Sequence, residues 1–194
     1  VTATVNPDGS YSTTADLSGL ADGPLTVTAT VSDTAGNPAT ATDTAALDTT
    51  AAITVSLEDV NGGNVGAAPI TGTTNGVEAG QTVTLQITDG TTTVTVAAVV
   101  NPDGSYSTTA DLSGLADGPL TVTATVSDTA GNPASATDTA ALDTSAAITV
   151  SLDDVNSGNV AAAPITGTTA GVEAGQTVTL VITDGTTTVT VAAV

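Results

Sequence analysis

The chain has 194 residues with no Lys, Arg, His or Cys, and its 20 Asp and Glu give a formal net charge of −20. Without His or Cys it lacks the usual zinc ligands, thiol nucleophiles and imidazole bases. Without Lys or Arg it cannot neutralise phosphates or an anionic bilayer by charge. The remaining Ser, Thr, Asp and Glu have no base to activate a hydroxyl. The composition therefore predicts a protein that is not an enzyme and has no nucleic-acid or direct membrane partner.

The chain has the composition of a folded protein despite its charge. Apolar residues make up 40% of it and the mean hydropathy is +0.29, which argues against disorder. Nearly all of these residues are Val, Ala, Leu and Ile, so the core is expected to consist of small aliphatic side chains. The sequence has no initiator Met and no recognisable signal peptide, and we interpret it as an internal piece of a longer protein.

Apolar and polar residues alternate along several short stretches, the period of a β-strand with one buried face. The clearest example is Leu120–Ser127, where Leu, Val and Ala alternate with Thr and Ser. The strands predicted for one repeat are, in chain order, Ile53–Leu57, Ala68–Thr74, Gln81–Thr88, Thr92–Val100, Ser105–Ala110, Leu120–Ser127 and Ser135–Leu142. Seven short strands separated by turns predict an all-β fold, an Ig-like antiparallel sandwich of two sheets.

Turn residues cluster between the predicted strands. Asn101-Pro102-Asp103-Gly104 is a typical hairpin turn, because Pro fixes its own φ, Asp can accept from the following backbone and Gly tolerates a positive φ. The stretch 88–91, Thr-Asp-Gly-Thr, predicts a second tight turn. Tyr106 follows the first turn at an inward position and is the largest side chain that the predicted core can receive.

The sequence repeats itself after 95 residues. Residues 5–99 and 100–194 differ at seven positions, which are Thr40/Ser135, Thr50/Ser145, Glu58/Asp153, Gly62/Ser157, Gly66/Ala161, Asn75/Ala170 and Gln86/Val181. Such a period suits one small domain and predicts tandem Ig-like domains. We place the boundaries after Asp48 and Asp143, between two predicted strands. The segment 1–48 is then the C-terminal part of a repeat, 49–143 a complete repeat, and 144–194 the N-terminal part of the next. A phasing of 1–95 and 96–190 would cut through strands.

Three stretches resemble a known class of repeats. "VEAGQTVTL", "NPDGSYSTTADLSGLADGPLTVTATVSDTAGN" and "ALDTT" are similar to the bacterial Ig-like tandem repeats of giant surface adhesins of the repeats-in-toxin and biofilm-associated type. The resemblance implies an extracellular extender at the bacterial cell surface, which projects an adhesive domain, with calcium at the domain junctions as its cofactor. The linker Asp-Thr-Thr-Ala-Ala lacks the proline that usually follows Ala in this family, which implies a linker angle less fixed by the backbone.

Oxygen-bearing side chains are predicted to gather at one end of each sandwich. In a seven-stranded sandwich the N-terminus lies beside the second–third and sixth–seventh strand loops, and Ca²⁺ takes six to eight oxygen ligands. The candidate metal ligands of the complete repeat are therefore Asp48, Glu78, Asp128 and Asn132, and those of its neighbours are Asp143, Glu173 and Asp33. Asp138 is a weaker candidate, because its position points inward. The loop 58–65, with Glu58, Asp59, Asn61 and Asn64, lies at the opposite end, facing the next domain.

These phrases have other interpretations. "DTAGN" and "NGVEAG" are also good turn sequences without a metal, and Asp89 and Asp103 are better explained as turn residues. For Glu58 and Asp59 a ligand role and a turn role are equally compatible with the sequence. The functional alternatives are a metal-free flexible linker and a subunit of a self-assembling extracellular filament. Ice binding by the Thr-x-Thr runs is not favoured, because it needs a flat and regular threonine array.

The two ends are predicted not to fold alone. The first part lacks strands one to three of its repeat and the last part lacks strands five to seven, so each would expose Val-rich faces and unpaired edges. The expected partners are neighbouring repeats of the same chain or head-to-tail copies. Either would form a composite domain in which Val191–Val194 approaches Val1–Thr4 of the following copy.

Overall fold

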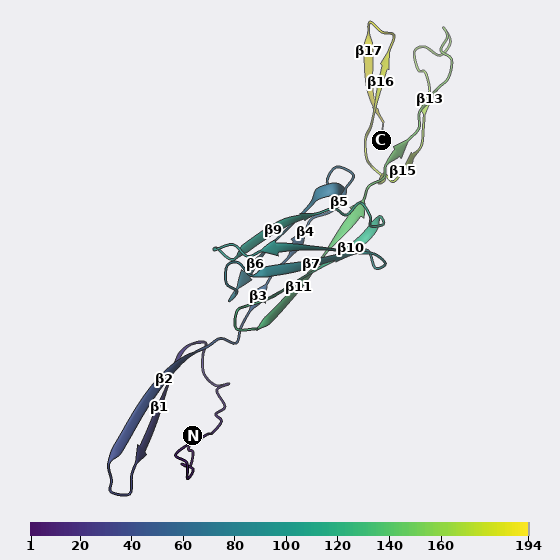
Figure 1. The fold of residues 1–194 in the computed structure, drawn as a ribbon. Coiled ribbons are helices and arrows are strands. Elements are labelled where there is room, and N and C mark those ends of the chain that lie inside the picture. The colour runs from purple at the N-terminus through teal and green to yellow at the C-terminus, as the bar shows by residue number, and fades with distance from the viewer. Residues whose placement is uncertain (194) are drawn as a thin grey trace.

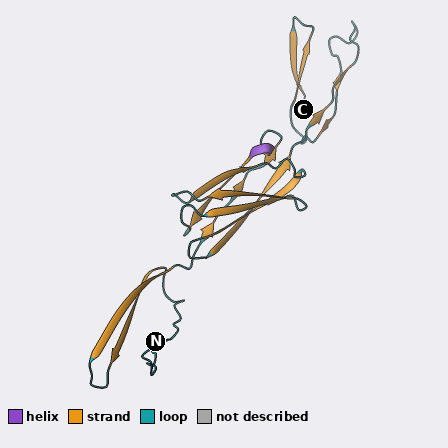
Figure 2. Cartoon of the chain, in the orientation of Figure 1, coloured by secondary structure: helices purple, strands orange, loops and turns teal. Residues whose placement is uncertain are grey.

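The structure is a computed structural model that describes residues 1–193, and it confirms the predicted all-β fold (Figures 1 and 2). A two-sheet sandwich occupies the middle of the chain, and smaller strand pairs precede and follow it. The two termini lie at opposite ends of the molecule in Figure 1. In the described part, no helix is long or apolar enough to cross a membrane.

The central sandwich consists of two sheets. One sheet has the order β5-β11-β10-β7-β8, from β5 (Val60–Asn61), β7 (Thr82–Thr88), β8 (Thr93–Val99), β10 (Gly118–Ser127) and β11 (Pro133–Asp143). In the other, β6 (Ala68–Asn75) pairs with β3 (Ala52–Ile53), β4 (Ser56–Leu57) and β9 (Ser105–Ala110). All pairings are antiparallel except that of β5 with β11.

The strands differ from the prediction mainly near the start of the repeat. The first predicted strand is divided into β3 and β4, and between them the Thr54 carbonyl accepts a hydrogen bond of 2.5 Å from the Tyr106 hydroxyl. The short strand β5 and the 3-10 helix η1 (Val65–Ala67) had not been predicted. With two and three residues, β5 and η1 are too short for a pattern of apolar and polar residues to indicate them.

Alternation along the strands builds one shared core. Leu120, Val122 and Ala124 on β10 are fully buried, whereas Thr121 and Thr125 on its other face are exposed. Tyr106 on β9 is the largest buried side chain, as predicted. Full burial of one Val, Leu or Ile side chain contributes about 1.5–3 kcal/mol. The core therefore obtains its stability from many small residues.

The two ends form strand pairs, not closed sandwiches. Near the N-terminus β1 (Gly23–Ser32) and β2 (Pro38–Leu47) make a hairpin, and residues 1–22 contain no strand. Near the C-terminus the pairs are β12 (Ala147–Ile148) with β15 (Thr169–Ala170), β13 (Ser151–Leu152) with β14 (Ile165–Thr166), and β16 (Val178–Thr183) with β17 (Thr188–Ala193). Figure 2 shows these pairs as isolated ribbons.

Candidate functional site at the domain junctions

The loops that were predicted to converge do lie together in the central domain. Thr129, in the β10–β11 loop, donates its backbone N–H to Glu78 Oε2 at 3.0 Å, and its hydroxyl donates to Glu78 Oε1. Glu78 belongs to the β6–β7 loop. Asn132 Nδ2 donates to the Asp48 carbonyl at 3.2 Å, which joins the β10–β11 loop to the incoming linker. Hydrogen bonds thus bring three distant segments to one end of the sandwich.

Asp128 is the buried polar residue of this end, with 5% of its surface exposed. Its Oδ1 accepts from the Asn132 backbone N–H at 2.8 Å, and its Oδ2 accepts from Asn132 Nδ2 at 2.7 Å. Burial opposes ionisation of this carboxyl more than any single bond favours it. The combined hydrogen bonds from Asn132 and the loop backbone nevertheless lower its pKa. Asp128 is therefore an anion that the loop holds in place.

The Asn132 amide stands between two carboxylates. Its Nδ2 is 2.7 Å from Asp128 Oδ2 and 3.4 Å from Asp48 Oδ1. Glu78 lies at the rim and is exposed, and the hydroxyl and backbone N–H of Thr129 lower its pKa. Asn132 therefore contacts both Asp48 and Asp128, and the fourth predicted residue, Glu78, contacts the neighbouring Thr129.

The donor chemistry of this end suits calcium, but its present arrangement is closed. Carboxylate and amide oxygens are ligands that Ca²⁺ prefers. Among residues 1–193, however, no group of three or more acidic side chains is placed to hold a metal ion. The oxygens of Asp128 and Glu78 already accept from Asn132 and Thr129. Binding of an ion would require those donors to move or the Asn132 amide to turn its oxygen inward.

The other predicted ligands are not gathered into a comparable group. Asp33 accepts from Asn37 in the β1–β2 loop, as Asp128 does from Asn132. Asp143 ends β11, and its Oδ1 accepts from Ser145 N at 3.1 Å. Glu173 lies in the β15–β16 loop, where its carbonyl accepts from Gln176 N. Within the described residues, no hydrogen bond joins Asp143 to Glu173. The weaker candidate Asp138 faces inward as expected, and its Oδ2 accepts from Leu57 N at 3.0 Å.

The loop 58–65 at the opposite end is held by its own side chains. Asp59 Oδ1 accepts from the Ala141 backbone N–H at 2.8 Å, and Asn64 Oδ1 accepts from Asn61 N at 2.7 Å. Gly62 lies close to the following linker, since a Cβ there would be 3.5 Å from the Thr144 carbonyl. In this structure the Asp59 carboxylate has a structural role that ties β5 to β11.

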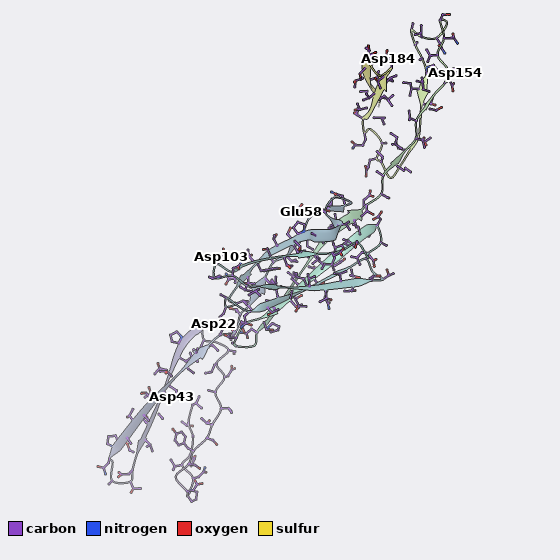
Figure 3. All side chains as sticks on the ribbon, turned by 45° about the horizontal axis from the view of Figure 1, so that its top comes forward. Asp22, Asp43, Glu58, Asp103, Asp154 and Asp184 are labelled. Atoms are coloured by element: carbon purple, nitrogen blue, oxygen red, sulfur yellow. The ribbon has the colours of Figure 1, made fainter. Side chains whose placement is uncertain are left out.

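An aspartate that is absent from the predicted sites holds each linker. Asp117 Oδ1 accepts from the Thr144 backbone N–H at 3.1 Å and from its hydroxyl at 2.9 Å. One repeat earlier, Asp22 makes the same two bonds to Thr49, at 3.1 and 2.7 Å, and a third to the Thr50 hydroxyl. We call this arrangement the linker clamp; Figure 3 shows Asp22 beside the first junction. Its sequence signal is an Asp–Gly–Pro stretch at the start of a hairpin whose second strand ends at a linker.

The linker clamp fixes a linker threonine, Thr49 or Thr144, to the segment that precedes the linker. The hydrogen-bond donors of the clamp lower the pKa of Asp22, the Thr49 hydroxyl most strongly and the Thr50 hydroxyl next. The linker lacks the proline that would restrict its backbone, and these side-chain bonds supply a restraint of another kind. Both linkers show it.

Solved structures of bacterial adhesins are similar to the chain. A tetra-tandem repeat in the extending region of a large adhesion protein is 38% identical, with a TM-score of 0.51, and the match covers 98% of this chain and 50% of that one. The Ig-like repeat architecture and the resemblance to large adhesins are confirmed. A structure concerned with host cell surface retention of a 1.5-MDa bacterial ice-binding adhesin is 28% identical, with a TM-score of 0.47, covering 97% and 66% of the two chains.

The third similar structure is of a Ca2+-stabilized adhesin that helps an Antarctic bacterium reach out and bind ice. It is 24% identical, with a TM-score of 0.48, and the match covers 87% of this chain and 45% of that one. The present chain spans about half the length of the tandem-repeat structure from the adhesin's extending region. No protein-family model matches the chain, and no curated protein matches it either.

Proposed function

We propose that the chain is a structural extender segment of a large cell-surface adhesin, which holds an adhesive part away from the bacterial cell. The observation that supports this most directly is the similarity to a tandem repeat from an adhesin's extending region, over nearly the whole chain. The near-identical repeats and the linker clamp at each junction are what a spacer requires. Its role is structural and not catalytic, and its place is the cell surface.

Within this function, residues 49–143 are one complete repeat. The segments 1–48 and 144–194 are parts of the repeats on either side. The linkers Asp48–Ala52 and Asp143–Ala147 are then equivalent junctions, each clamped by an aspartate of the preceding domain.

Calcium is the proposed stiffening ligand, at the end that carries Asp48, Asp128 and Asn132. These side chains offer oxygens next to the linker, and the whole chain has no cationic side chain to compete for them. Like charges on adjacent domains repel, so a divalent ion between them would stabilise the junction and the folded domains that bind it. The Asn132 amide, which now bridges two carboxylates, would turn its oxygen toward the ion.

Comparison of calcium with chelator tests this assignment. With millimolar calcium the chain should melt at a higher temperature, and small-angle scattering should give a longer particle, than with chelator. Asp48→Asn should abolish the response and leave the fold intact, because the hydrogen bonds that this carboxylate accepts from the described residues are long, at 3.4 Å each. The matched control is Asp111→Asn, which removes a turn carboxylate bonded to Ser113 and should keep the response. Equal values in calcium and chelator would leave a metal-free linker.

A further inference from the structure

The differences between the two repeats are concentrated in the loop that faces the outgoing linker. Three of the seven lie within residues 58–66, and they are Glu58/Asp153, Gly62/Ser157 and Gly66/Ala161. Figure 3 labels Glu58 at the end of the central sandwich from which the chain continues into its second linker. A residue that varies at this place can change how the linker is held, provided that it touches the linker.

The loop is fixed to the strand that leads into the linker. The two-residue strand β5 pairs with the end of β11, where Asn61 lies opposite Asp143. Asp59 Oδ1 accepts from the Ala141 backbone N–H at 2.8 Å, which joins the start of the loop to the same strand. The loop therefore belongs to the central domain, and its contact with the linker is a contact between domain and linker.

The loop makes the same internal hydrogen bonds with glycine or with serine at its variable position. In the central domain Asn61 Oδ1 accepts from the Gly63 backbone N–H at 2.8 Å. In the next repeat, which has Ser157, Asn156 Oδ1 accepts from the Gly158 backbone N–H at the same 2.8 Å. A serine is therefore compatible with this loop.

Gly62 is the variable position that touches the linker. A Cβ on Gly62 would lie 3.5 Å from the Thr144 carbonyl oxygen, and Gly62 is not among the glycines with a positive φ. A hydroxyl oxygen about 2.8 Å from its acceptor places its own Cβ about 3.5 Å from that acceptor. A serine at position 62 thus has the distance needed to donate to the Thr144 carbonyl. By contrast, nothing lies within 4 Å of a Cβ on Gly66.

Thr144 is held by hydrogen bonds through only part of its polar groups. Its backbone N–H and its hydroxyl donate to Asp117 Oδ1 in the linker clamp. Within residues 1–193, no hydrogen bond to its carbonyl oxygen is made. Because the linker has no proline, each bond to Thr144 is a large part of the restraint between domain and linker. A hydroxyl at position 62 would supply a further bond, from the loop to this carbonyl.

We propose that the residue at position 62 sets how firmly a repeat holds the linker that follows it. A repeat with glycine there holds its linker by the clamp alone. A repeat with serine adds a hydrogen bond from its loop to the carbonyl of the clamped threonine. Junctions of one array therefore differ in stiffness through a single loop residue. This inference rests on the proposed extender function and adds a positioning residue to its junctions.

Gly62→Ser in the full chain, studied by NMR in chelator, tests the proposal. The carbonyl carbon resonance of Thr144 should move downfield, because its oxygen accepts a new hydrogen bond. Hydrogen exchange at the Thr144 amide should slow about fivefold, the effect of one typical hydrogen bond, since opening of the linker must now break that bond as well. Unchanged values of both in Gly62→Ser would overturn the proposal.

Gly62→Ala is the matched control, because it adds the same Cβ without a hydroxyl. Replacing a glycine also reduces the freedom of the unfolded backbone, and alanine does this as serine does. The Thr144 carbonyl resonance and amide exchange in Gly62→Ala should therefore stay close to those of the unmodified chain. Equal changes in the alanine and serine variants would assign the effect to the backbone and contradict a hydrogen bond from the hydroxyl.

The stiffness of the junction itself is read from backbone order parameters of residues 144–146. They should rise in Gly62→Ser and stay unchanged in Gly62→Ala. These measurements report on one linker, whereas the extender function is tested by how particle length grows with the number of repeats. Constant growth together with an unaltered linker in Gly62→Ser would overturn the role of position 62 and leave the extender function. A compact array with a stiffer linker in Gly62→Ser would reject the extender function and support the role of position 62.

Discussion

The central domain and the N-terminal part share one sequence and have two different structures. Residues 100–127 and 5–32 are identical, yet Tyr106 and Val122 are buried while Tyr11 and Val27 are exposed. The hairpin forms in both, because its register depends on local turns and alternation. Strand β9 forms only where β6 lies beside it. Local sequence therefore determines the hairpin, and burial depends on strands from a distant segment.

The largest expected effect separates the two tyrosines. Tyr106→Ala should lower the free energy of unfolding of the central domain by about 3–5 kcal/mol, because it removes the largest core side chain and leaves a cavity. Tyr11→Ala should leave that free energy unchanged at concentrations where the chain is monomeric. Denaturant unfolding of both variants measures the difference. Equal losses would show that Tyr11 is part of a folded core after all.

A smaller effect is expected at the glycine that receives the Tyr106 ring. A Cβ on Gly72 would lie 2.2 Å from the Thr54 carbonyl and 2.4 Å from the Tyr106 hydroxyl, so Gly72→Ala should cost about 1–3 kcal/mol. Gly66→Ala is the matched control, since nothing lies within 4 Å of its Cβ and the next repeat has Ala161 there. Thermal unfolding should show a lower transition only for Gly72→Ala. An unchanged unfolding transition in Gly72→Ala would mean that the Tyr106 ring can pack in another position.

Acid should distinguish two equivalent turn carboxylates. Backbone N–H donors lower the pKa of Asp184 to about 2, those of Thr187 and Thr186 most strongly. Asp89 accepts the same kind of bonds and one more, from Ala116, and its pKa is lowered further. Depressed values mean that both contributions to stability are present above the ordinary value of 3.8 and are lost as the pH falls through the folded value. Carboxyl NMR titration should find a lower pKa for Asp89 than for Asp184. The reverse order would show that the hydrogen bond from Ala116 does not lower the pKa of Asp89.

The smallest effect on stability should come from the linker clamp. Asp117→Ala removes the acceptor for Thr144 without opening the core, so the melting temperature should hardly change. Hydrogen exchange at the Thr144 amide should accelerate, and the spread of inter-domain angles should widen in scattering data. Asp111→Ala is the control, because its bonds to Ser113 lie within one turn. An unchanged Thr144 exchange rate would show that the clamp does not restrain the linker.

The sequence was sufficient for the all-β Ig-like fold, for most strands of the central domain and for the convergence of its loops, because these follow from alternation and Ig-like connectivity. Alternation predicts that the Tyr106 side chain points inward. It could not predict that the ring packs against Gly72 or that the hydroxyl donates to the Thr54 carbonyl. The linker clamp could not be predicted because the partner of Asp117, Thr144, lies 27 residues away. Alternation also could not show that Asn132 would occupy the space between Asp48 and Asp128.

The extender function is tested most directly by small-angle scattering on chains of one to four complete repeats. A ten-residue strand such as β10 spans roughly 33 Å, so each added repeat should lengthen the particle by roughly 40 Å once its linker is included. The maximum dimension should grow in constant steps as long as the linker clamp is intact. A compact particle, whose maximum dimension barely increases from two repeats to four, would contradict it.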